Sequence, residues 1–373
     1  MPPNAVITGW GMYAPQRILT NQDLARMVDT SDEWIVTRTG IRERRIAADD
    51  ETTTTLSVYA ARDALAVAGL DPTELDLVIV GTCSPDYPLP ATGVLVARDL
   101  GATRAAGFDL QAACSGFLFA LATGSSFIRS GMYRNVLVLG VEVLSRFLDW
   151  HDRGTCVLFG DGAGAVILSA SDQPGGLLGL ELFSDGTGAE GIIVPAGGSA
   201  CPASPQTSAE GGHFIHMSGA DVYRYATRQL AESTLAALRS AGLGVDDIDQ
   251  FVYHQANLRI IKSVGKQLQI PDEKVFVNIE KYGNTSAASV PMALVEAVAS
   301  GRIKQGDRLL MAAFGAGYTA GAAVVEWTAD PLQAFRAPGA QTRLGKPRSA
   351  GAATLGETAA DEEAALPEVA AAG

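Results

Sequence analysis

The chain has 373 residues, 47% of them hydrophobic and 18% charged, with no run of eighteen or more apolar residues. This composition is typical of a soluble globular protein large enough for two core-bearing units, and because the sequence opens without a secretory signal we expect a cytoplasmic protein with no membrane anchor. The formal net charge of −13 argues against broad binding to nucleic acids, and an acidic partner would need a local basic patch.

The cysteines and histidines suggest neither a disulfide framework nor a metal centre. The four cysteines include no CxxC pair, which fits a reducing compartment better than a disulfide-bonded fold. His213 and His216 form an HxxH pair, but no third ligand with suitable spacing accompanies them, so we expect no metal site.

The order of predicted elements occurs twice along the chain. Three pairs of segments match in the same order: 68–80 with 241–253, 130–140 with 300–311, and 159–168 with 314–325. Each half contains a helix, an acidic turn, an apolar strand, a second helix and two closing strands around a Gly-rich turn. Alternating helices and continuous apolar strands predict buried sheets in an α/β fold. The sequence therefore predicts two α/β halves related by duplication.

We place the first half at residues 1–175 and the second at 176–328. The remaining segment, 329–373, is rich in Ala, Gly and Pro and has no aromatic residue after Phe335. Such a segment buries too little apolar surface to offset its chain entropy, so we expect a disordered tail.

Cys114 lies where a predicted strand gives way to a predicted helix, in GFDLQAACSGFLFAL at 107–121. At a helix start the unpaired N–H groups and the helix dipole favour a thiolate, so we expect the pKa of Cys114 to fall below about 8.5. Its small neighbours leave room for a substrate carbonyl. The alternative is a buried structural cysteine.

His254 and Asn284 also follow apolar strands. A shift of 173 residues places His254 just after the second copy of a strand, and a shift of 170 carries Cys114 onto Asn284. Strand ends form the usual rim of a site in α/β folds, so the three side chains could converge between the halves. Taken singly, His254 could be a core residue and Asn284 a turn residue or an N-cap.

A Cys-His-Asn set has two chemical uses. In a thiol hydrolase, the histidine is the general base and the asparagine orients it. In decarboxylative carbon–carbon bond formation, the cysteine carries an acyl group, and two neutral donors stabilise the charge left on a malonyl thioester after CO₂ departs. No obvious catalytic Asp or Glu lies near these residues in the sequence, which favours the second use.

Two glycine-rich segments, 160–166 and 314–321, superficially resemble dinucleotide-binding loops. Such a loop should open a helix, whereas strand-like apolar residues follow both segments here. We expect tight strand connections, with a backbone N–H near Ala316 facing the substrate oxygen.

Together and in this order, QAACSG, HQANLRI, YGNTSAASVP and FGAGYTAG resemble β-ketoacyl-[acyl-carrier-protein] synthase III, a family of thiolase-fold condensing enzymes. The resemblance covers residues 4 to about 328 and is strengthened by the segments 30–46 and 153–168. It implies a thiolase-like α/β fold in α-β-α-β-α layers and a homodimeric acyltransferase without metal or redox cofactor. The implied reaction is the decarboxylative Claisen condensation of acyl-CoA with malonyl-[acyl-carrier protein], which gives 3-oxoacyl-[acyl-carrier protein], CO₂ and CoA and initiates fatty acid biosynthesis.

Two alternatives to this function remain. The same chemistry could prime a polyketide or another specialised pathway. A non-catalytic scaffold could also use the fold, although the joint presence of cysteine, histidine and asparagine argues against it.

The resemblance assigns the reacting groups position by position. Cys114 matches the acylated nucleophile, and His254 and Asn284 match the pair that activates the malonyl thioester. The backbone N–H groups of Cys114 and Ala316 match the oxyanion hole.

The resemblance also assigns the binding residues. Trp34 and Arg153 match the residues that sandwich the adenine of CoA, Arg38 matches a contact to its nucleotide end, and Asn257 matches a group near the pantetheine arm. The carrier-protein contact segment is matched by Gln255, Ala256, Asn257, Leu258 and Arg259. Independently of the resemblance, Arg259 begins a basic helix face with Lys262 and Lys266, as an acidic carrier would require; the alternative is an ordinary solvated helix face. For Trp34 and Arg38, the alternative to CoA binding is an ordinary cation–π pair within a helix.

Three positions depart from the family pattern. Leu89 lies where the family often has a bulky aromatic residue that reaches across the dimer to the floor of the acyl pocket. Tyr223 occupies a position that is commonly Phe, and Ala316 one where the family also has Gly. The smaller Leu89 side chain would enlarge the acyl pocket, so short branched or longer primers are plausible beside acetyl.

Overall fold

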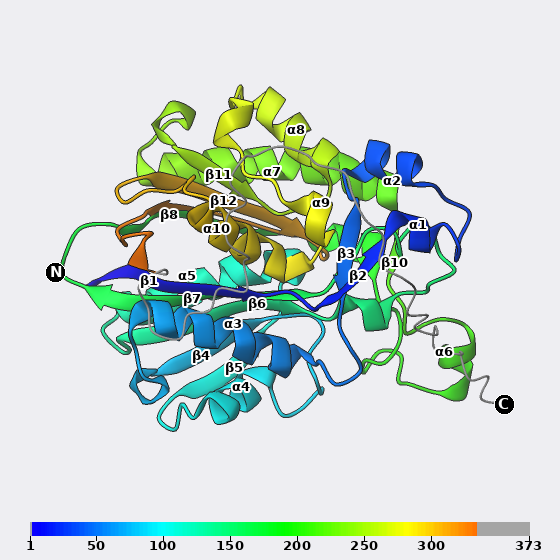
Figure 1. The fold of residues 1–373 in the computed structure, drawn as a ribbon, viewed down its shortest axis with the longest axis horizontal. Helices are drawn as coiled ribbons and strands as arrows, with labels where there is room; N and C mark the ends of the chain where they lie inside the picture. The colour runs from blue at the N-terminus through cyan, green and yellow to red at the C-terminus, as the bar shows by residue number, and fades with distance from the viewer. Residues whose placement is uncertain (1, 334–373) are drawn as a thin grey trace, which may run out of the picture. The chain divides into compact units, whose positions relative to one another are not determined.

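The computed structural model describes residues 2–333, in which two large sheets alternate with layers of helices (Figure 1). The first sheet has the order β1-β7-β6-β4-β5 and consists of β1 (Asn4–Tyr13), β7 (Gly162–Ser171), β6 (Asn135–Glu142), β4 (Leu77–Gly81) and β5 (Ala106–Leu110). β4 runs parallel to β5 and β6, while β7 is antiparallel to β6 and β1. Every residue of β4 is buried. Because a central parallel strand is covered on both faces, its sequence is a continuous apolar run.

The second sheet has the order β11-β12-β13-β8 and consists of β11 (Gln250–Tyr253), β12 (Arg308–Gly315), β13 (Thr319–Glu326) and β8 (Gly176–Ser184). β11 runs parallel to β12, and the other pairs are antiparallel. The glycine-rich segment 314–321 joins β12 to β13, as predicted. The segment 160–166 follows a turn and forms the start of β7, so it does not connect two strands.

Helices α5 (Gly116–Arg129) and α10 (Ser289–Ala299) lie between the sheets and contact both (Figure 1). α10 is buried from Ser289 to Val298, because a helix enclosed by two sheets has no solvent face. The outer face of the first sheet is covered by α3 (Thr53–Ala68) and α4 (Thr92–Leu100), and that of the second by α7 (Gly219–Ala241), on which α8 (Leu258–Gln267) packs. This is the layered α-β-α-β-α arrangement that was expected.

The remaining elements are short and lie mainly around the ends of the sheets. They are β2 (Arg17–Thr20), β3 (Glu43–Ile46), α1 (Asn21–Leu24), α2 (Asp32–Thr39), β9 (Ile192–Ile193), α6 (Pro205–Ala209), β10 (His216–Met217) and α9 (Ile279–Tyr282). β2 pairs with β3 and β9 pairs with β10, both antiparallel.

The duplication is visible in the structure with a shift of 173 residues. The 3₁₀ turn η2 (Ala113–Ser115) precedes α5, and its counterpart η7 (Ser286–Ala288) precedes α10. Both turns start on a left-handed residue, since Ala113 has φ 45° and Ser286 has φ 48°. Cys114 therefore corresponds to Ala287. The alignment of Cys114 with Asn284 at a shift of 170 is wrong, because the turn that carries the cysteine recurs three residues further on.

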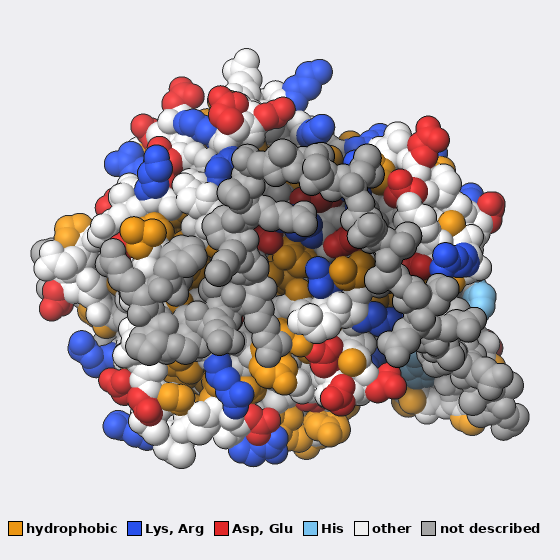
Figure 2. Space-filling view, in the orientation of Figure 1, with side chains coloured by type: hydrophobic (Ala, Val, Ile, Leu, Met, Phe, Trp, Pro, Cys, Tyr) orange, Lys and Arg blue, Asp and Glu red, His pale blue; other side chains and the backbone are white. Residues whose placement is uncertain are grey.

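β7 ends at Ser171 and β8 begins at Gly176, and the division into halves at 175/176 stays a prediction. Most of the predicted tail, residues 334–373, lies outside the described residues. Among the described residues no helix is long and apolar enough to cross a bilayer. On the face in Figure 2, Lys and Arg side chains are interspersed with Asp and Glu side chains, so the described residues there form no single basic surface.

Candidate active site

Cys114 sits in η2, in the short link between β5 and α5. The hairpin that joins β12 to β13 lies against this turn: a Cβ added at Gly315 would be only 2.6 Å from the backbone nitrogen of Cys114. The Thr319 hydroxyl donates to the Ala112 carbonyl at 2.8 Å and fixes the contact. Glycine at 315 thus lets the Ala316 turn approach the nucleophile's own backbone.

One cavity of about 1430 Å³ brings the three predicted residues together. Cys114, His254 and Asn284 all line it, although they lie in three separate segments of the chain. Ala316 lines the same cavity. The expected convergence is therefore present in the structure. The prediction that Asn284 follows a strand is wrong, because the short helix α9 precedes it.

His254 follows β11 and is held as a neutral hydrogen-bond donor. Burial lowers its pKa to about 3, so the imidazole carries no charge at neutral pH. Its Nδ1 lies 2.5 Å from the Ser289 hydroxyl, which accepts a hydrogen bond from the Gln255 N–H at 3.3 Å. In the tautomer in which the Ser289 hydroxyl donates to Nδ1, the imidazole proton lies on Nε2.

Asn284 is fixed by its own turn. Its Oδ1 accepts the Ser286 N–H at 2.9 Å, and its backbone bonds to the Leu158 carbonyl and the Gly160 N–H at 2.8 and 3.0 Å. With the amide oxygen occupied, the Nδ2 group is the part of this side chain that remains to donate to a ligand in the cavity.

The electrostatics of Cys114 differ from the sequence-based prediction. Its residue surface is partly exposed to the cavity, yet desolvation raises the pKa of the thiol to about 12. A hydrogen bond from the Ser286 side chain lowers this pKa, and the charge of Glu142 raises it. The prediction of a pKa below about 8.5 is wrong, because removal of the sulfur from water outweighs the local donors.

Two family models and many relatives match the chain. The model described as "3-Oxoacyl-[acyl-carrier-protein (ACP)] synthase III" matches residues 108–186, and its "C terminal" counterpart matches 238–327. The protein named β-ketoacyl-[acyl-carrier-protein] synthase III from Roseiflexus sp. (strain RS-1) is 53% identical over 325 residues, which cover 87% of this chain and 99% of that protein. The chain belongs to this family.

Solved structures agree with this assignment to the synthase III family. The 3-oxoacyl-[acyl-carrier-protein] synthase III from Aquifex aeolicus VF5 has a TM-score of 0.81 and 46% identity, and the match covers 87% of this chain and all of that one. A priming β-ketosynthase from the R1128 polyketide pathway has a TM-score of 0.82 and 39% identity, over 89% of this chain and 98% of that one. The thiolase-like fold predicted from the motifs is thereby confirmed.

The residues that the resemblance to synthase III assigned to CoA lie close together beside the cavity. Trp34 and Arg38, on α2, line it, and the Arg38 guanidinium lies 4.8 Å from the centre of the Trp34 ring. Arg153 lies 5.5 Å from the same ring and donates to the Asp29 carbonyl at 2.7 Å. Asn257 also lines the cavity, caps α8 and donates to the Arg38 carbonyl at 3.1 Å, so it joins α8 to α2.

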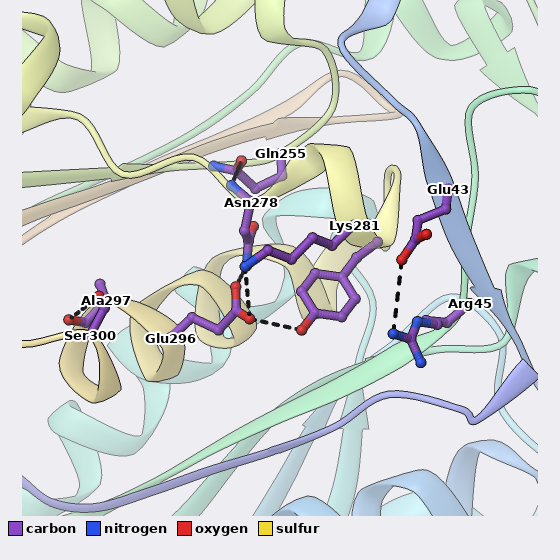
Figure 3. A network of polar contacts seen from close by, with 9 residues as sticks. Glu43, Arg45, Gln255, Asn278, Lys281, Glu296, Ala297 and Ser300 are labelled. Atoms are coloured by element: carbon purple, nitrogen blue, oxygen red, sulfur yellow. Dashed lines mark hydrogen bonds and ion pairs between the residues drawn. The ribbon is translucent and has the colours of Figure 1, made fainter. Parts of the chain in front are cut away.

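The residues of the predicted carrier-protein segment differ in exposure. Gln255 is buried: its Nε2 donates to the Tyr253 carbonyl at 2.7 Å, and its Oε1 accepts the Asn278 N–H at 3.0 Å (Figure 3). Asn278 in turn donates to Glu296 at 2.8 Å. Ala256, Asn257 and Leu258 are half-buried, while Arg259 is exposed, as are Lys262 and Lys266 on the same helix. Within this segment, Arg259 is thus the side chain that faces outward.

Leu89 is 83% exposed and does not line the cavity of its own chain. Tyr87 and Val94 beside it in the sequence are also exposed. Its predicted place in an acyl pocket therefore depends on a second copy of the chain.

The HxxH histidines bond to neighbouring oxygens. His213 Nε2 lies 3.0 Å from the Thr207 hydroxyl, and His216 Nε2 lies 3.2 Å from the Gly211 carbonyl. Across residues 2–333 no three His, Cys, Asp or Glu side chains are grouped so as to hold a metal ion.

The sequence analysis missed Glu142, the last residue of β6. Its side chain is fully buried, and Ser286 joins it to the active-site turn by a hydrogen bond of 3.1 Å. A carboxylate at the end of the apolar run NVLVLGVE was the available signal, since an unpaired charge rarely ends a buried strand without a role.

Proposed function

We propose that this chain condenses an acyl-CoA primer with malonyl-[acyl-carrier protein], releasing CO₂ and CoA, and so initiates fatty acid biosynthesis. The observation that carries the proposal is the meeting of Cys114, His254 and Asn284 in one cavity of a synthase III family member. In this reaction the three residues divide two chemical steps between them.

The first step transfers the primer to Cys114. The sulfur attacks the acyl-CoA carbonyl, and the backbone N–H groups of Cys114 and Ala316 would stabilise the resulting oxyanion. The close approach of Gly315 to the Cys114 nitrogen supports this pairing, because it brings the two backbone segments together.

The second step generates the carbon nucleophile. The thioester oxygen of the malonyl group accepts hydrogen bonds from His254 Nε2 and Asn284 Nδ2, which stabilise the enolate left by departing CO₂. The enolate carbon then attacks the Cys114 thioester. No proton is removed from carbon, so a neutral histidine with a pKa of about 3 suits this role. The proposed chemistry requires neither a metal nor a redox cofactor.

The partners follow from the cavity and its surroundings. Trp34, Arg38, Arg153 and Asn257 would bind CoA. The segment from Gln255 to Arg259 would meet the carrier protein, with Arg259 supported by Lys262 and Lys266. We further propose a cytoplasmic homodimer in which Leu89 of one chain helps to form the acyl pocket of the other, so that acetyl or a short branched primer fits.

Similarity favours primary fatty acid synthesis over a specialised pathway. The curated relatives at 53% identity are named β-ketoacyl-[acyl-carrier-protein] synthase III, whereas the polyketide-priming enzyme is 39% identical. A panel of acyl-CoA primers with malonyl-[acyl-carrier protein] tests pathway and primer together.

Radiolabelled acyl-CoA tests the nucleophile. The wild-type protein should retain label on the peptide that contains Cys114, and Cys114→Ala should retain none. Cys201→Ser, a matched change at a half-buried cysteine that does not line the cavity, should be labelled as wild type is. Equal labelling of Cys114→Ala and wild type would mean that the assigned nucleophile is wrong.

A further inference from the structure

Glu296 is a buried carboxylate on α10 that accepts hydrogen bonds from three residues. Its Oε2 accepts the Asn278 amide at 2.8 Å, and its Oε1 accepts the Tyr282 hydroxyl at 2.8 Å. The exposed ammonium of Lys281 lies 3.4 Å from Oε1 and supplies the countercharge. None of these four residues lines the cavity. Because the carboxylate is paired and hydrogen-bonded at both oxygens, it holds its partners in fixed places behind the site.

The first arm of this network leads to the segment that carries His254. Figure 3 shows Asn278 between Gln255 and Glu296, and the Asn278 N–H donates to Gln255 Oε1 at 3.0 Å. Gln255 Nε2 in turn donates to the Tyr253 carbonyl at 2.7 Å. Tyr253 and Gln255 are the residues on either side of His254. The first arm therefore fixes the backbone before and after the imidazole.

The second arm leads to Asn284. Tyr282 ends α9 two residues before Asn284, and Gly283 between them has a left-handed backbone with φ 64°. A Cβ added at Gly283 would lie 2.8 Å from the Leu158 carbonyl oxygen, which also accepts the Asn284 N–H at 2.8 Å. Because this link is tightly packed, a shift of Tyr282 would be passed on to Asn284.

Helix α10 connects both arms to one rigid element. Ser289, in its first turn, lies 2.5 Å from His254 Nδ1, and Glu296 lies seven residues further on, on the same face of the helix. The helix is buried from Ser289 to Val298 and contacts both sheets. Because such a helix cannot move without repacking the sheets around it, it provides a fixed reference for both donors.

The groups proposed for acylation are held by other contacts. Cys114 lies in η2, and Ala316 lies in the hairpin between β12 and β13. Within residues 2–333, no hydrogen bond joins either of them to Glu296, Asn278 or Tyr282. The network is therefore connected to the two nitrogen donors and separate from the nucleophile.

We propose that Glu296 is a positioning residue for decarboxylation: it sets the spacing between His254 Nε2 and Asn284 Nδ2. It acts through Asn278 on the first donor and through Tyr282 on the second. This inference rests on the proposed function for its substrate, malonyl-[acyl-carrier protein]. The enolate oxygen must receive both hydrogen bonds at once, so the separation of the donors determines how well they stabilise it. A residue that only stabilises the fold would slow both chemical steps together or neither.

The test compares the two steps in single-turnover experiments. Acylation is measured as release of CoA from acetyl-CoA, and decarboxylation as release of labelled CO₂ from malonyl-[acyl-carrier protein] by the acylated protein. Glu296→Ala should release CO₂ about 10²-fold more slowly than wild type, with an unchanged half-saturating concentration of malonyl-[acyl-carrier protein] and acylation within about twofold. Glu296→Gln keeps the chain length and one acceptor oxygen, so it should release CO₂ within about tenfold of the wild-type rate.

Two milder variants separate the arms and keep the test open if Glu296→Ala does not fold. Asn278→Ala removes the amide but retains the backbone N–H that donates to Gln255, and Tyr282→Phe removes one hydroxyl. Each should slow CO₂ release about tenfold and leave acylation unchanged. Because the double variant removes both contacts, it should match Glu296→Ala.

Tyr13→Phe is the matched control. Tyr13 on β1 is also buried, and its hydroxyl also donates to a glutamate, Glu51 Oε1, at 2.5 Å. Neither Tyr13 nor Glu51 lines the cavity, so this variant should perform both steps at the wild-type rates.

Three outcomes overturn the positioning role: CO₂ release at the wild-type rate by Glu296→Ala, equal slowing of both steps in it, or the same selective loss in Tyr13→Phe. Crystal structures decide the question without activity. The distance between His254 Nε2 and Asn284 Nδ2 should change by about 1 Å in Glu296→Ala, and an unchanged distance would also overturn the proposal. Absence of CO₂ release from wild type would refute the proposed function, while this distance would still decide the positioning role.

Discussion

Replacing Gly315 by alanine would push directly on the backbone of the nucleophile. The added Cβ would lie 2.6 Å from the Cys114 nitrogen and 3.2 Å from the Ala113 Cβ, whereas ordinary contact begins at 3.4 Å. The two backbones must then separate by about 0.8 Å, and both belong to structured elements that resist such a shift. Overpacking of this kind costs about 1–3 kcal/mol of folding free energy.

The same shift should also slow acylation. A misplacement near 1 Å costs about 10²-fold in rate, and here it would displace an oxyanion donor. Single-turnover release of CoA from acetyl-CoA measures the step, and thermal unfolding measures the stability. Gly186→Ala is the control, because a Cβ there meets nothing within 4 Å. Wild-type acylation by a folded Gly315→Ala variant would refute the proposed contact between the hairpin and the nucleophile.

Three further changes test separate parts of the site. Leu89→Phe should shift the primer preference toward acetyl-CoA by about tenfold over a branched primer, and an unchanged ratio of kcat/KM values would remove Leu89 from the pocket. Arg259→Glu should raise KM for malonyl-[acyl-carrier protein] but leave malonyl-CoA unaffected, and equal effects on both would contradict a carrier contact. The folded pKa of His254 lies below the unfolded value of about 6.5, so the folded state loses stability as pH falls from about 6.5 toward 3. Acid unfolding of His254→Gln, followed by circular dichroism, should therefore begin at lower pH than that of wild type. Coincident unfolding curves would show that the buried imidazole does not titrate in this way.

The strand and helix pattern could be predicted from the sequence because it depends on local periodicity. The buried runs of β4 and β11 and the apolar length of α10 are readable in one dimension. The convergence of Cys114 and His254 could also be predicted, since both follow strands in a duplicated α/β pattern. The place of Asn284 could not, because it follows the short helix α9 and not the strand that was expected.

The burial and the pKa values of the site's groups could not be predicted, because they depend on what surrounds each group in three dimensions. The raised pKa of Cys114 follows from desolvation by segments distant in the chain. Glu142 and Gly315 occupy corresponding places in the two halves, at the ends of β6 and β12, yet one supplies a buried carboxylate and the other a gap for the Cys114 backbone. Neither role is encoded in local periodicity.

The central claim is that Cys114, His254 and Asn284 act in one pocket on two separate steps. Cys114 carries the primer, and the nitrogen donors of His254 and Asn284 stabilise the enolate formed when CO₂ departs. Release of labelled CO₂ from malonyl-[acyl-carrier protein] by pre-acylated His254→Ala, Asn284→Ala and the double variant tests it most directly. We predict that all three accept the acyl group yet release CO₂ at least about 10²-fold more slowly than wild type, with the double variant little slower than the single ones. Release at the wild-type rate from any acylated variant would contradict the account.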